Sequence, residues 1–287
     1  MTAHGIVLVD CPDEVGLIHR ITGVLRGDGL SIDSSDQFVD VARQHFFFRA
    51  EVVATQPGAA ADPLADERLR QALAAVLPAA AVVRVTRPER RPIVVCATRE
   101  PHCLGELLLL DAVGDLPGRI VAVISNHGVL RELTDRFGVP FVHLPAEGVD
   151  RDAHEAALAA AIDAHAPALV VLARYMRVLS AGFVTRYPGR IVNIHHSFLP
   201  AFAGAQAYRQ AYERGVKLIG ATAHVVTAEL DAGPIIAQDV IDVDHAATPE
   251  RMARAGRDVE KLVLARAVRL LLEDRVFVHG GRTVVFD

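Results

Sequence analysis

The sequence predicts an α/β protein that is divided into two domains. Residues 1–86 contain strand-like and helix-like segments in the order βαββαβ, and beyond residue 92 short, unbroken apolar runs alternate with helical segments. Between these regions, residues 87–92 hold two prolines and four charged residues, a composition typical of a stiff, solvated linker. With 287 residues, of which 51% are hydrophobic, the chain has enough apolar material for two cores.

The elements of the first domain follow from its apolar pattern and its chain-breaking residues. Pro12 and Asp13 provide a turn and an acidic cap for a helix that ends before Gly27 and Gly29. After the small, breaker-rich residues 56–62, leucines recur at helical spacing. We expect strands at residues 4–9, 30–39, 44–54 and 81–85 and helices at about 12–26 and 64–77. This order is that of the ferredoxin-like fold, whose sheet is open on one face.

The second domain, residues 93–287, has the pattern of a Rossmann-like, mostly parallel sheet. Strands buried on both faces are apolar throughout, and parallel strands need helical crossovers between them. Runs of this kind occur at residues 93–98, 119–125, 140–144, 168–173 and 190–195. A later pair of strands, 221–227 and 234–243, flanks a glycine-containing turn, and a long helix from 249 to 273 closes the domain. Ligands of such sheets bind at the carboxyl ends of the strands.

Composition and charge exclude several classes of protein. The formal charge of −5, without a basic block, argues against a nucleic-acid partner. No apolar stretch reaches the length of a membrane span, and the first ten residues lack the features of a secretory signal. The three cysteines, Cys11, Cys96 and Cys103, have no C-x-x-C spacing and suit reduced thiols. We therefore expect a cytoplasmic protein with a small-molecule partner.

Asn193 and His195 form the first candidate pair for chemistry. They lie two residues apart at the end of an expected strand, so both side chains project from one face while Ile194 packs on the other. An amide donor and an imidazole at this edge could meet one substrate carbonyl. The alternative is a buried polar pair that bonds only to the backbone.

Asp231 is the second candidate, in the turn Leu-Asp-Ala-Gly-Pro between two apolar strands. Aspartate is common in turns merely because it bonds its own backbone. The run Gly-Ala-Thr-Ala-His at 220–224 and the segment around His195 both fall at carboxyl ends or connecting turns of one expected sheet, which favours a joint site. A carboxylate, an imidazole and an amide together suit the attack of water or an amine on a carbonyl.

Two other interpretations involve histidines. His196 is expected to face the side opposite His195 and to act in packing or in support of the site. A zinc hydrolase that uses His195, His196 and His224 is the other alternative. Adjacent strand residues diverge, however, and no H-E-x-x-H pattern is present, so we expect no metal.

The pattern N-I-H-x-S-x-L-P at 193–200, followed by G-A-T-x-H-x-V and L-D-x-G-P-I-I, resembles the formyltransferase family that handles 10-formyltetrahydrofolate. The resemblance implies that Asn193, His195 and Asp231 are the catalytic triad. It extends to residues 170–180, which resemble the folate-pocket segment of the family. The expected substrate contacts are Met176, Arg177, Val178, Leu179, His224, Leu230 and Gly233. No cofactor beyond the folate substrate is expected.

Residues 11–22, 98–108, 208–222 and 255–268 resemble, more narrowly, the deformylase branch of this family. That implies hydrolysis of 10-formyltetrahydrofolate to formate and tetrahydrofolate, which balances one-carbon folate pools and supplies formate for purine synthesis. The loop 99–105 supports water as the acceptor, because it lacks the small residues that cradle a phosphate and Pro101 lacks an N–H donor. The branch that acts on methionyl-tRNA is disfavoured, because no basic RNA-facing module is present.

The first domain resembles an ACT module, a regulatory fold that binds amino acids between paired copies. The resemblance implies a homo-oligomer joined through these domains and an amino-acid effector, such as glycine or methionine, near Asp13 and Gly16. A purely structural dimerisation domain is the alternative. For the whole chain, two rival functions remain: an amino-acid sensor with a vestigial catalytic domain, and transfer of the formyl group to an unknown amine.

Overall fold

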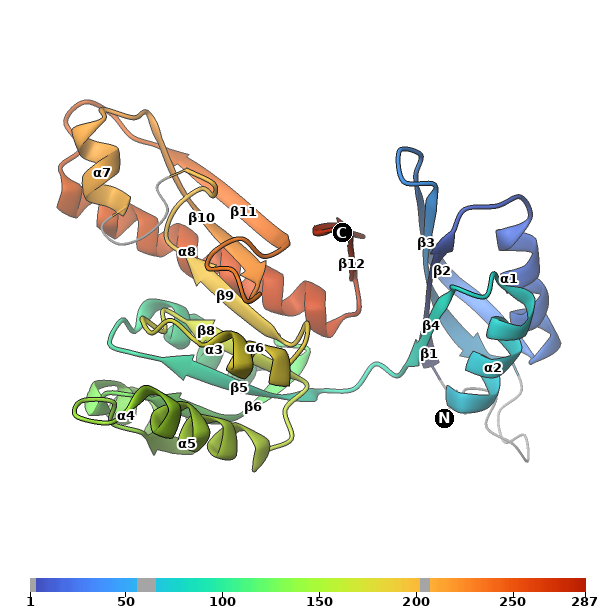
Figure 1. Ribbon diagram of the computed structural model, residues 1–287, viewed down its shortest axis with the longest axis horizontal. Coiled ribbons are helices and arrows are strands. Elements are labelled where there is room, and N and C mark those ends of the chain that lie inside the picture. Colours follow the sequence, from blue (N-terminus) through green and yellow to red (C-terminus); the bar gives the residue numbers. More distant parts are fainter. Residues whose placement is uncertain (1–3, 56–65, 202–206) are drawn as a thin grey trace. The chain divides into compact units, whose positions relative to one another are not determined.

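A computed structural model of the chain describes residues 4–55, 66–201 and 207–287, which fold into two compact units (Figure 1). The first unit comprises Met1–Glu89 together with two C-terminal segments, Glu273–Phe277 and Val284–Asp287. The second comprises Arg90–Leu272 and Val278–Thr283. No helix in the described ranges is both long enough and apolar enough to cross a membrane.

The first unit has the expected βαββαβ order. Its elements are β1 (His4–Pro12), α1 (Leu17–Gly27), β2 (Leu30–Asp40), β3 (His45–Ala54), α2 (Asp66–Val76) and β4 (Val82–Thr86). The strands form an antiparallel sheet in the order β2-β3-β1-β4. Alternate apolar residues of β1 and β3, such as Val9 and Phe48, share one core with apolar residues of the two helices, such as Leu17 and Leu73.

The helix α1 begins later than the sequence pattern predicts. The expected start at Pro12 is wrong, because β1 continues through Pro12, which pairs with His45 of β3. The N–H of Asp13 still donates to the carbonyl of Gln44 at 2.8 Å. Gly16, with a φ of 90°, then turns the chain into the helix, a conformation that favours glycine. The expected breaker-rich segment 56–62 and the start of the second helix lie outside the described residues.

The second face of this sheet is covered by the end of the chain. Phe277 packs with Ile6, Leu8 and Phe47, and its ring contacts that of Phe47 edge-on at 5.5 Å between centroids. The expectation that all of residues 93–287 belong to the second domain is therefore wrong for Glu273–Phe277 and Val284–Asp287, which belong to the first unit. The cause is the hydrophobic effect. The sheet has apolar side chains on both faces, and the C-terminal segments shield those of the second face from water.

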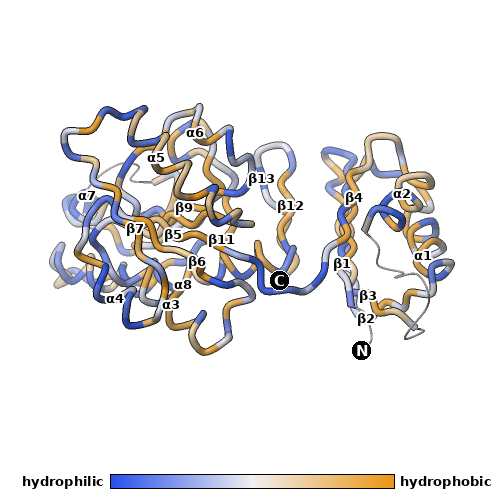
Figure 2. The backbone as a smooth tube through the Cα atoms, turned by 90° about the horizontal axis from the view of Figure 1, so that it is seen from below, coloured by the Kyte–Doolittle hydropathy of each residue, from blue (hydrophilic) through white to orange (hydrophobic). Residues whose placement is uncertain are grey.

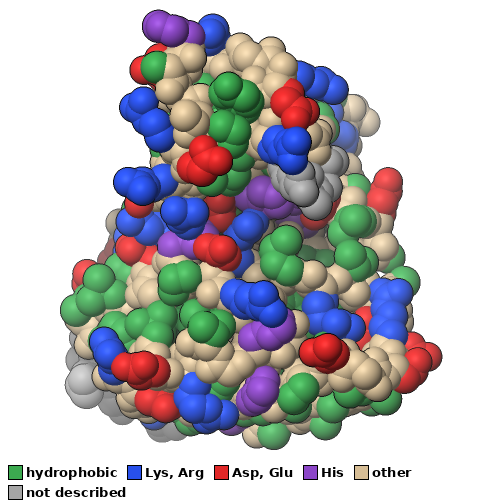
Figure 3. Space-filling view, turned by 90° about the vertical axis from the view of Figure 1, so that its left-hand side faces the viewer, with side chains coloured by type: hydrophobic (Ala, Val, Ile, Leu, Met, Phe, Trp, Pro, Cys, Tyr) green, Lys and Arg blue, Asp and Glu red, His purple; other side chains and the backbone are tan. Residues whose placement is uncertain are grey.

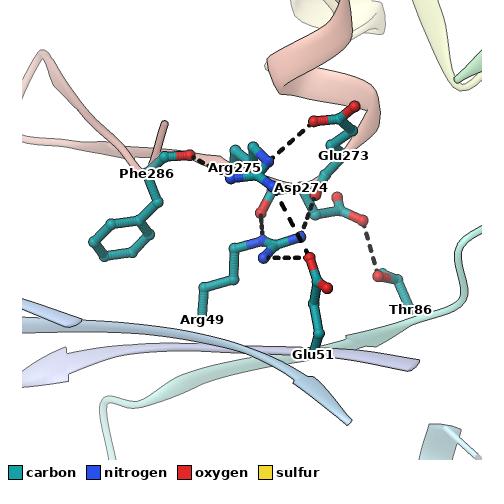
Figure 4. A network of polar contacts seen from close by, with 7 residues as sticks. All are labelled: Arg49, Glu51, Thr86, Glu273, Asp274, Arg275 and Phe286. Atoms are coloured by element: carbon teal, nitrogen blue, oxygen red, sulfur yellow. Dashed lines mark hydrogen bonds and ion pairs between the residues drawn. The ribbon is translucent and has the colours of Figure 1, made fainter. Parts of the chain in front are cut away.

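A buried arginine ties these C-terminal residues to the sheet (Figure 4). Arg49 is 2% exposed; its Nε donates to the carbonyl of Asp274 at 3.2 Å and its Nη2 to that of Glu273 at 3.1 Å. Its Nη1 donates to Glu51 at 3.0 Å, and Thr86 donates to the Asp274 carboxylate at 2.8 Å. The guanidinium thus keeps all three nitrogens paired, which is what a buried charge requires.

The second unit is built around a seven-stranded sheet. Its elements are β5 (Arg91–Ala97), α3 (His102–Val113), β6 (Gly118–Ser125), a 3-10 turn (Gly128–Leu130), α4 (Arg131–Asp135), β7 (Phe141–His143), α5 (Arg151–Asp163), β8 (Leu169–Ala173), α6 (Ala181–Arg186), β9 (Ile191–His195), α7 (Ala207–Glu213), β10 (Leu218–Val225), β11 (Ile235–Asp242) and α8 (Pro249–Leu272). The sheet order is β11-β10-β9-β8-β5-β6-β7, with β5 to β9 parallel and β10 antiparallel to both neighbours. A short pair, β12 (Val276–His279) and β13 (Arg282–Val285), ends the chain.

Helices cover both faces of this sheet, as the unbroken apolar strands predict (Figures 1 and 2). The helices α5 and α6 pack on β5, β6 and β8 through residues such as Leu158 and Phe183. On the other face α8 packs along β9, β10 and β11 and against α3. The linker is shorter than expected, because Arg91 and Pro92 already belong to β5, which leaves residues 87–90 outside regular elements.

Candidate active site

The site lies at the carboxyl end of β9, beside β10. In the antiparallel pair of these strands, His224 lies directly opposite Asn193, and Thr222 lies opposite His195. Asn193 is half-buried, whereas His195 and His224 are 5% and 2% exposed. Residues that are 31 positions apart in the sequence thus become cross-strand neighbours.

Asp231 joins them from the turn between β10 and β11. Its Oδ2 lies 3.2 Å from Nδ1 of His195, and its Oδ1 lies 3.7 Å from Nε2 of His224. The residue has a φ of 54°, in the left-handed region that aspartate tolerates better than most residues. Gly233 permits the tight turn, because a Cβ there would lie 1.7 Å from the carbonyl oxygen of Val225. The turn is therefore held in one position.

His224 orients the amide of Asn193. Its Nδ1 lies 3.1 Å from the carbonyl oxygen of Val225, which can only accept a hydrogen bond, so Nδ1 carries the hydrogen. Nε2 of His224 is then the acceptor and receives a hydrogen bond from Nδ2 of Asn193 at 3.3 Å. This assignment leaves the second N–H of the Asn193 amide for a substrate.

The charges of the site are set by these contacts. The hydrogen bond from Nδ1 of His195 holds the pKa of the Asp231 carboxyl well below its usual range, although burial opposes this shift. Asp231 is therefore ionised at neutral pH. Burial, followed by the positive charge of Arg174, lowers the pKa of His196 to about 4, so that this neighbouring ring is neutral.

His195 presents an unused nitrogen. Its Nε2 is buried and has no hydrogen-bond partner within the described ranges. A buried polar atom without a partner is costly in an ordinary core and is typical of a site that awaits a ligand. A carboxylate that can take a proton, beside an imidazole and an amide that can donate to an oxygen, can promote attack on a carbonyl group.

A cavity of about 300 Å³ opens onto these side chains. Of the expected substrate contacts it is lined by Met176, Arg177, Val178, Leu179, His224 and Leu230, together with Asn193, His195 and Asp231. Gly233 does not line the cavity: it is buried against Val225 and shapes the turn instead. Histidine, acidic and basic side chains gather in the hollowed middle of the face of this unit seen in Figure 3.

His196 differs from its expected orientation. It lines the same cavity as His195, and the two rings lie 5.1 Å apart between centroids. The reason is that β9 ends at His195, so the two-residue alternation of a strand no longer applies at the next position.

Two polar side chains that the sequence motifs do not single out, Thr222 and Gln238, support the chain after His196. Thr222 accepts from the N–H of Leu199 at 3.0 Å and donates to the carbonyl of Ser197 at 2.8 Å. Gln238 donates to the carbonyl of Leu199 at 3.0 Å. The Gly-Ala-Thr-Ala-His run is the only sequence signal for Thr222, and Gln238 has none. Thr98 accepts a hydrogen bond from the N–H of Met176, a residue that lines the cavity, at 3.0 Å.

The expected effector residues, Asp13 and Gly16, belong to the first unit, whereas the catalytic candidates belong to the second. Gly16 directly precedes α1, and both it and Asp13 are exposed. The helix N-terminus has no side-chain cap, which leaves its first N–H groups free of a side-chain acceptor.

Comparison with protein families agrees with this division of the chain. Residues 91–268 match the formyl transferase family, and residues 5–71 match the ACT domain family. The formyl transferase match covers the seven-stranded sheet and α3 to α8 almost completely.

Individual curated proteins and solved structures resemble this chain over all or most of its length. A formyltetrahydrofolate deformylase of Haemophilus influenzae is 49% identical over 280 residues, which are 98% of each chain. The crystal structure of a formyltetrahydrofolate deformylase from Pseudomonas syringae pv. tomato has a TM-score of 0.92 at 41% identity and covers 100% of this chain and 95% of that one. Glycinamide ribonucleotide transformylase 1 from Symbiobacterium toebii has a TM-score of 0.67 at 37% identity and covers 70% of this chain and 97% of that one.

Proposed function

Because this chain belongs to the formyl transferase family, and within it to the formyltetrahydrofolate deformylases, we propose that it hydrolyses 10-formyltetrahydrofolate to formate and tetrahydrofolate at the site formed by Asn193, His195 and Asp231. The observation that carries the assignment of these residues is the 3.2 Å contact between His195 and the ionised Asp231, both of which line the cavity.

Asp231 is the proton carrier of the reaction. It takes a proton from the attacking water while the water oxygen bonds to the formyl carbon, and the bond between that carbon and N10 of the folate then breaks. The proton passes to N10, which leaves as a neutral amine. A carboxylate with a low pKa is a weak base, so its main contribution is to place the water and to stabilise positive charge on the neighbouring imidazole.

Asn193 and His195 stabilise the oxyanion that forms on the formyl oxygen. The unpaired Nε2 of His195 donates to it when the ring is protonated, and the free N–H of the Asn193 amide donates beside it. Both groups are held before the reaction begins, His195 by Asp231 and Asn193 by His224, so little reorganisation is needed.

The folate lies along residues 176–179 and 226–230, whose apolar members suit its ring system. Arg177 lines the same cavity and supplies a local positive charge for an anionic substrate in a chain whose net charge is −5. The reaction needs no cofactor and no metal, because the proton carrier and both oxyanion donors are side chains.

The ACT domain gives the first unit a regulatory function. An amino acid, glycine or methionine, binds near Asp13 and Gly16, where the turn at Gly16 meets the N-terminus of α1, and the domains pair in a homo-oligomer. In the cytoplasm this regulation would balance one-carbon folate pools and set the supply of formate for purine synthesis.

Incubation of the purified full chain with 10-formyltetrahydrofolate, with and without amines, tests the function. Formate and tetrahydrofolate in equal amounts without any amine support hydrolysis. Turnover that requires an amine would instead support a transferase, and absence of turnover would support a sensor. Titration of glycine and methionine in the same assay and by calorimetry tests the effector; no binding and unchanged kinetics would leave the first unit structural.

A further inference from the structure

The catalytic cavity is lined by a charged side chain, that of Arg174, which the reaction above does not use. Arg174 directly follows β8 and lines the cavity together with His195 and His196. Its side chain is 14% exposed, and its Nε lies 3.3 Å from Oε2 of Glu260 on α8. Arg174 has a φ of 59°, a left-handed conformation that costs a non-glycine residue free energy unless its surroundings hold it there.

Glu260 is the centre of a cluster of polar side chains. It is 1% exposed, accepts a hydrogen bond from the hydroxyl of Tyr208, and lies 2.9 Å from Nε2 of His102. Burial alone would raise the pKa of Glu260, but the contacts with His102 and Arg174 outweigh it and the pKa is lowered. Gly256, one turn earlier in α8, leaves room for Tyr208, because a Cβ there would lie 2.0 Å from the Tyr208 oxygen.

The composition of this cluster suits an internal ion pair better than a cation site. His102, Cys103 and Glu260 offer atoms within 4.8 Å of one another. The guanidinium of Arg174 already supplies positive charge to Glu260, and burial, followed by Glu260, raises the pKa of the Cys103 thiol well above its usual range. Glu260 therefore needs no cation to neutralise its charge.

The position of Arg174 in the cavity bears on whether water or an amine attacks the formyl carbon. The Symbiobacterium relative, whose name describes transfer to glycinamide ribonucleotide, shares the catalytic domain at 37% identity. Attack by water and attack by an amine use the same proton carrier and the same oxyanion donors, so the acceptor is selected by the room beside the formyl carbon. The cavity of about 300 Å³ is of the size of one ligand, and Arg174 and His196 line it together with apolar side chains such as Leu179.

We propose that the ion pair of Arg174 and Glu260, supported by His102 and Tyr208, determines acceptor specificity: it closes the catalytic cavity to amines and leaves water as the nucleophile. This inference rests on the proposed hydrolysis. The guanidinium acts by its bulk and by its charge, because most primary amines are cations at neutral pH and are repelled by it.

Removal of the Arg174 side chain should admit an amine. The nitrogen of a primary amine would then bond to the formyl carbon, the bond from that carbon to N10 would break, and one proton would pass from the amine through Asp231 to N10. The products are an N-formyl amine and tetrahydrofolate, and no further reactant is needed. The carboxylate of Glu260, freed of its guanidinium, would attract the amine.

The test uses the full chain, 10-formyltetrahydrofolate with a ¹³C-labelled formyl group, and glycinamide as the amine. Nuclear magnetic resonance counts labelled formate and labelled N-formylglycinamide in one tube. For Arg174→Gly, which suits the observed φ, we expect the ratio of formylglycinamide to formate to rise at least ~10-fold over the wild type. For Arg174→Met, which keeps most of the bulk of the side chain, the ratio should lie between those of the wild type and Arg174→Gly. Arg186→Ala, which removes an exposed ion pair of the same unit, should not change the ratio.

Formate release by Arg174→Gly with no more formylglycinamide than the wild type would overturn the inference. If the variant folds by circular dichroism but turns over too slowly, binding of glycinamide is measured by magnetic resonance titration. Binding to the variant and not to the wild type supports the inference, and equal binding or none to either contradicts it. Formate release by the wild type without an amine tests the proposed function separately: if no formate is released, the proposed function is wrong.

Discussion

The carboxylate of Asp231 lies 3.2 Å from Nδ1 of His195, although the two residues belong to a turn and a strand that are 36 positions apart in the sequence. The contact keeps Asp231 ionised and leaves Nε2 of His195 directed to no other residue of the described ranges. This one contact thus sets the charge of the proton carrier, Asp231, and orients an oxyanion donor, His195.

Replacement of Asp231 by asparagine should lower kcat by at least ~10³-fold, because the amide can neither take a proton nor stabilise a protonated His195. Steady-state release of formate measures the effect. Asp258→Asn, an exposed carboxylate of the same unit, is the control and should keep wild-type activity. Substantial hydrolysis by Asp231→Asn would show that another base serves the reaction.

Asn193→Ala should lower kcat by about 10²- to 10³-fold, since one oxyanion donor is lost, with little change in folding. The sequence has a second asparagine, Asn126, which does not line the cavity and provides a matched control as Asn126→Ala. Equal kcat values for Asn193→Ala and the wild type would remove Asn193 from the mechanism.

Gly233→Ala should lower kcat by about 10²-fold, because the added Cβ would meet the carbonyl of Val225 at 1.7 Å and displace the turn that holds Asp231. Gly105→Ala, at a helical position where no atom outside the neighbouring helix backbone lies within 4 Å of the new Cβ, should be active. If Gly233→Ala is as active as Gly105→Ala, the turn must adjust without moving the carboxylate.

His196 should make the stability of the second unit depend on pH. Because its folded pKa is lowered to about 4, the unfolded chain binds the proton more tightly between that value and about 6.5, and stability falls as the pH decreases through this window. The loss is at most about 3 kcal/mol. Denaturant unfolding of His196→Gln between pH 7.5 and 4.5 should show a flatter profile than the wild type, whereas the exposed His245→Gln should reproduce the wild-type slope.

Arg49→Met should lower the free energy of unfolding of the first unit by about 2–4 kcal/mol, since three charge-assisted hydrogen bonds of a buried group are lost. Arg43→Met removes an arginine of the neighbouring turn that is paired with Asp40 near the surface, and should leave the unfolding midpoint almost unchanged. Equal midpoints in urea for both variants would mean that the C-terminal segments do not stabilise the sheet.

Local patterns explain why much of the fold is predictable. The unbroken apolar strands β5, β6 and β8 and the 24-residue helix α8 follow from periodicity that a sequence shows directly. The start of α1 differs from the prediction because cross-strand pairing of Pro12 with His45 outweighs the local preference for a helix. The return of Phe277 to the first unit is not predictable in this way, because apolar side chains do not specify which sheet they will cover.

Strand periodicity, which is local, is enough to predict the βαββαβ order and the mostly parallel sheet, whereas the three residues that we place in catalysis are predicted from the resemblance of their motifs to the formyl transferase family. Three features can be seen only in the tertiary structure: His224 lies opposite Asn193, His196 lines the catalytic cavity, and Arg174 forms an ion pair with Glu260. The physical reason is that hydrogen bonds and ion pairs depend on distances of about 3 Å, and only strand register and helix packing bring residues so far apart in the chain to that separation.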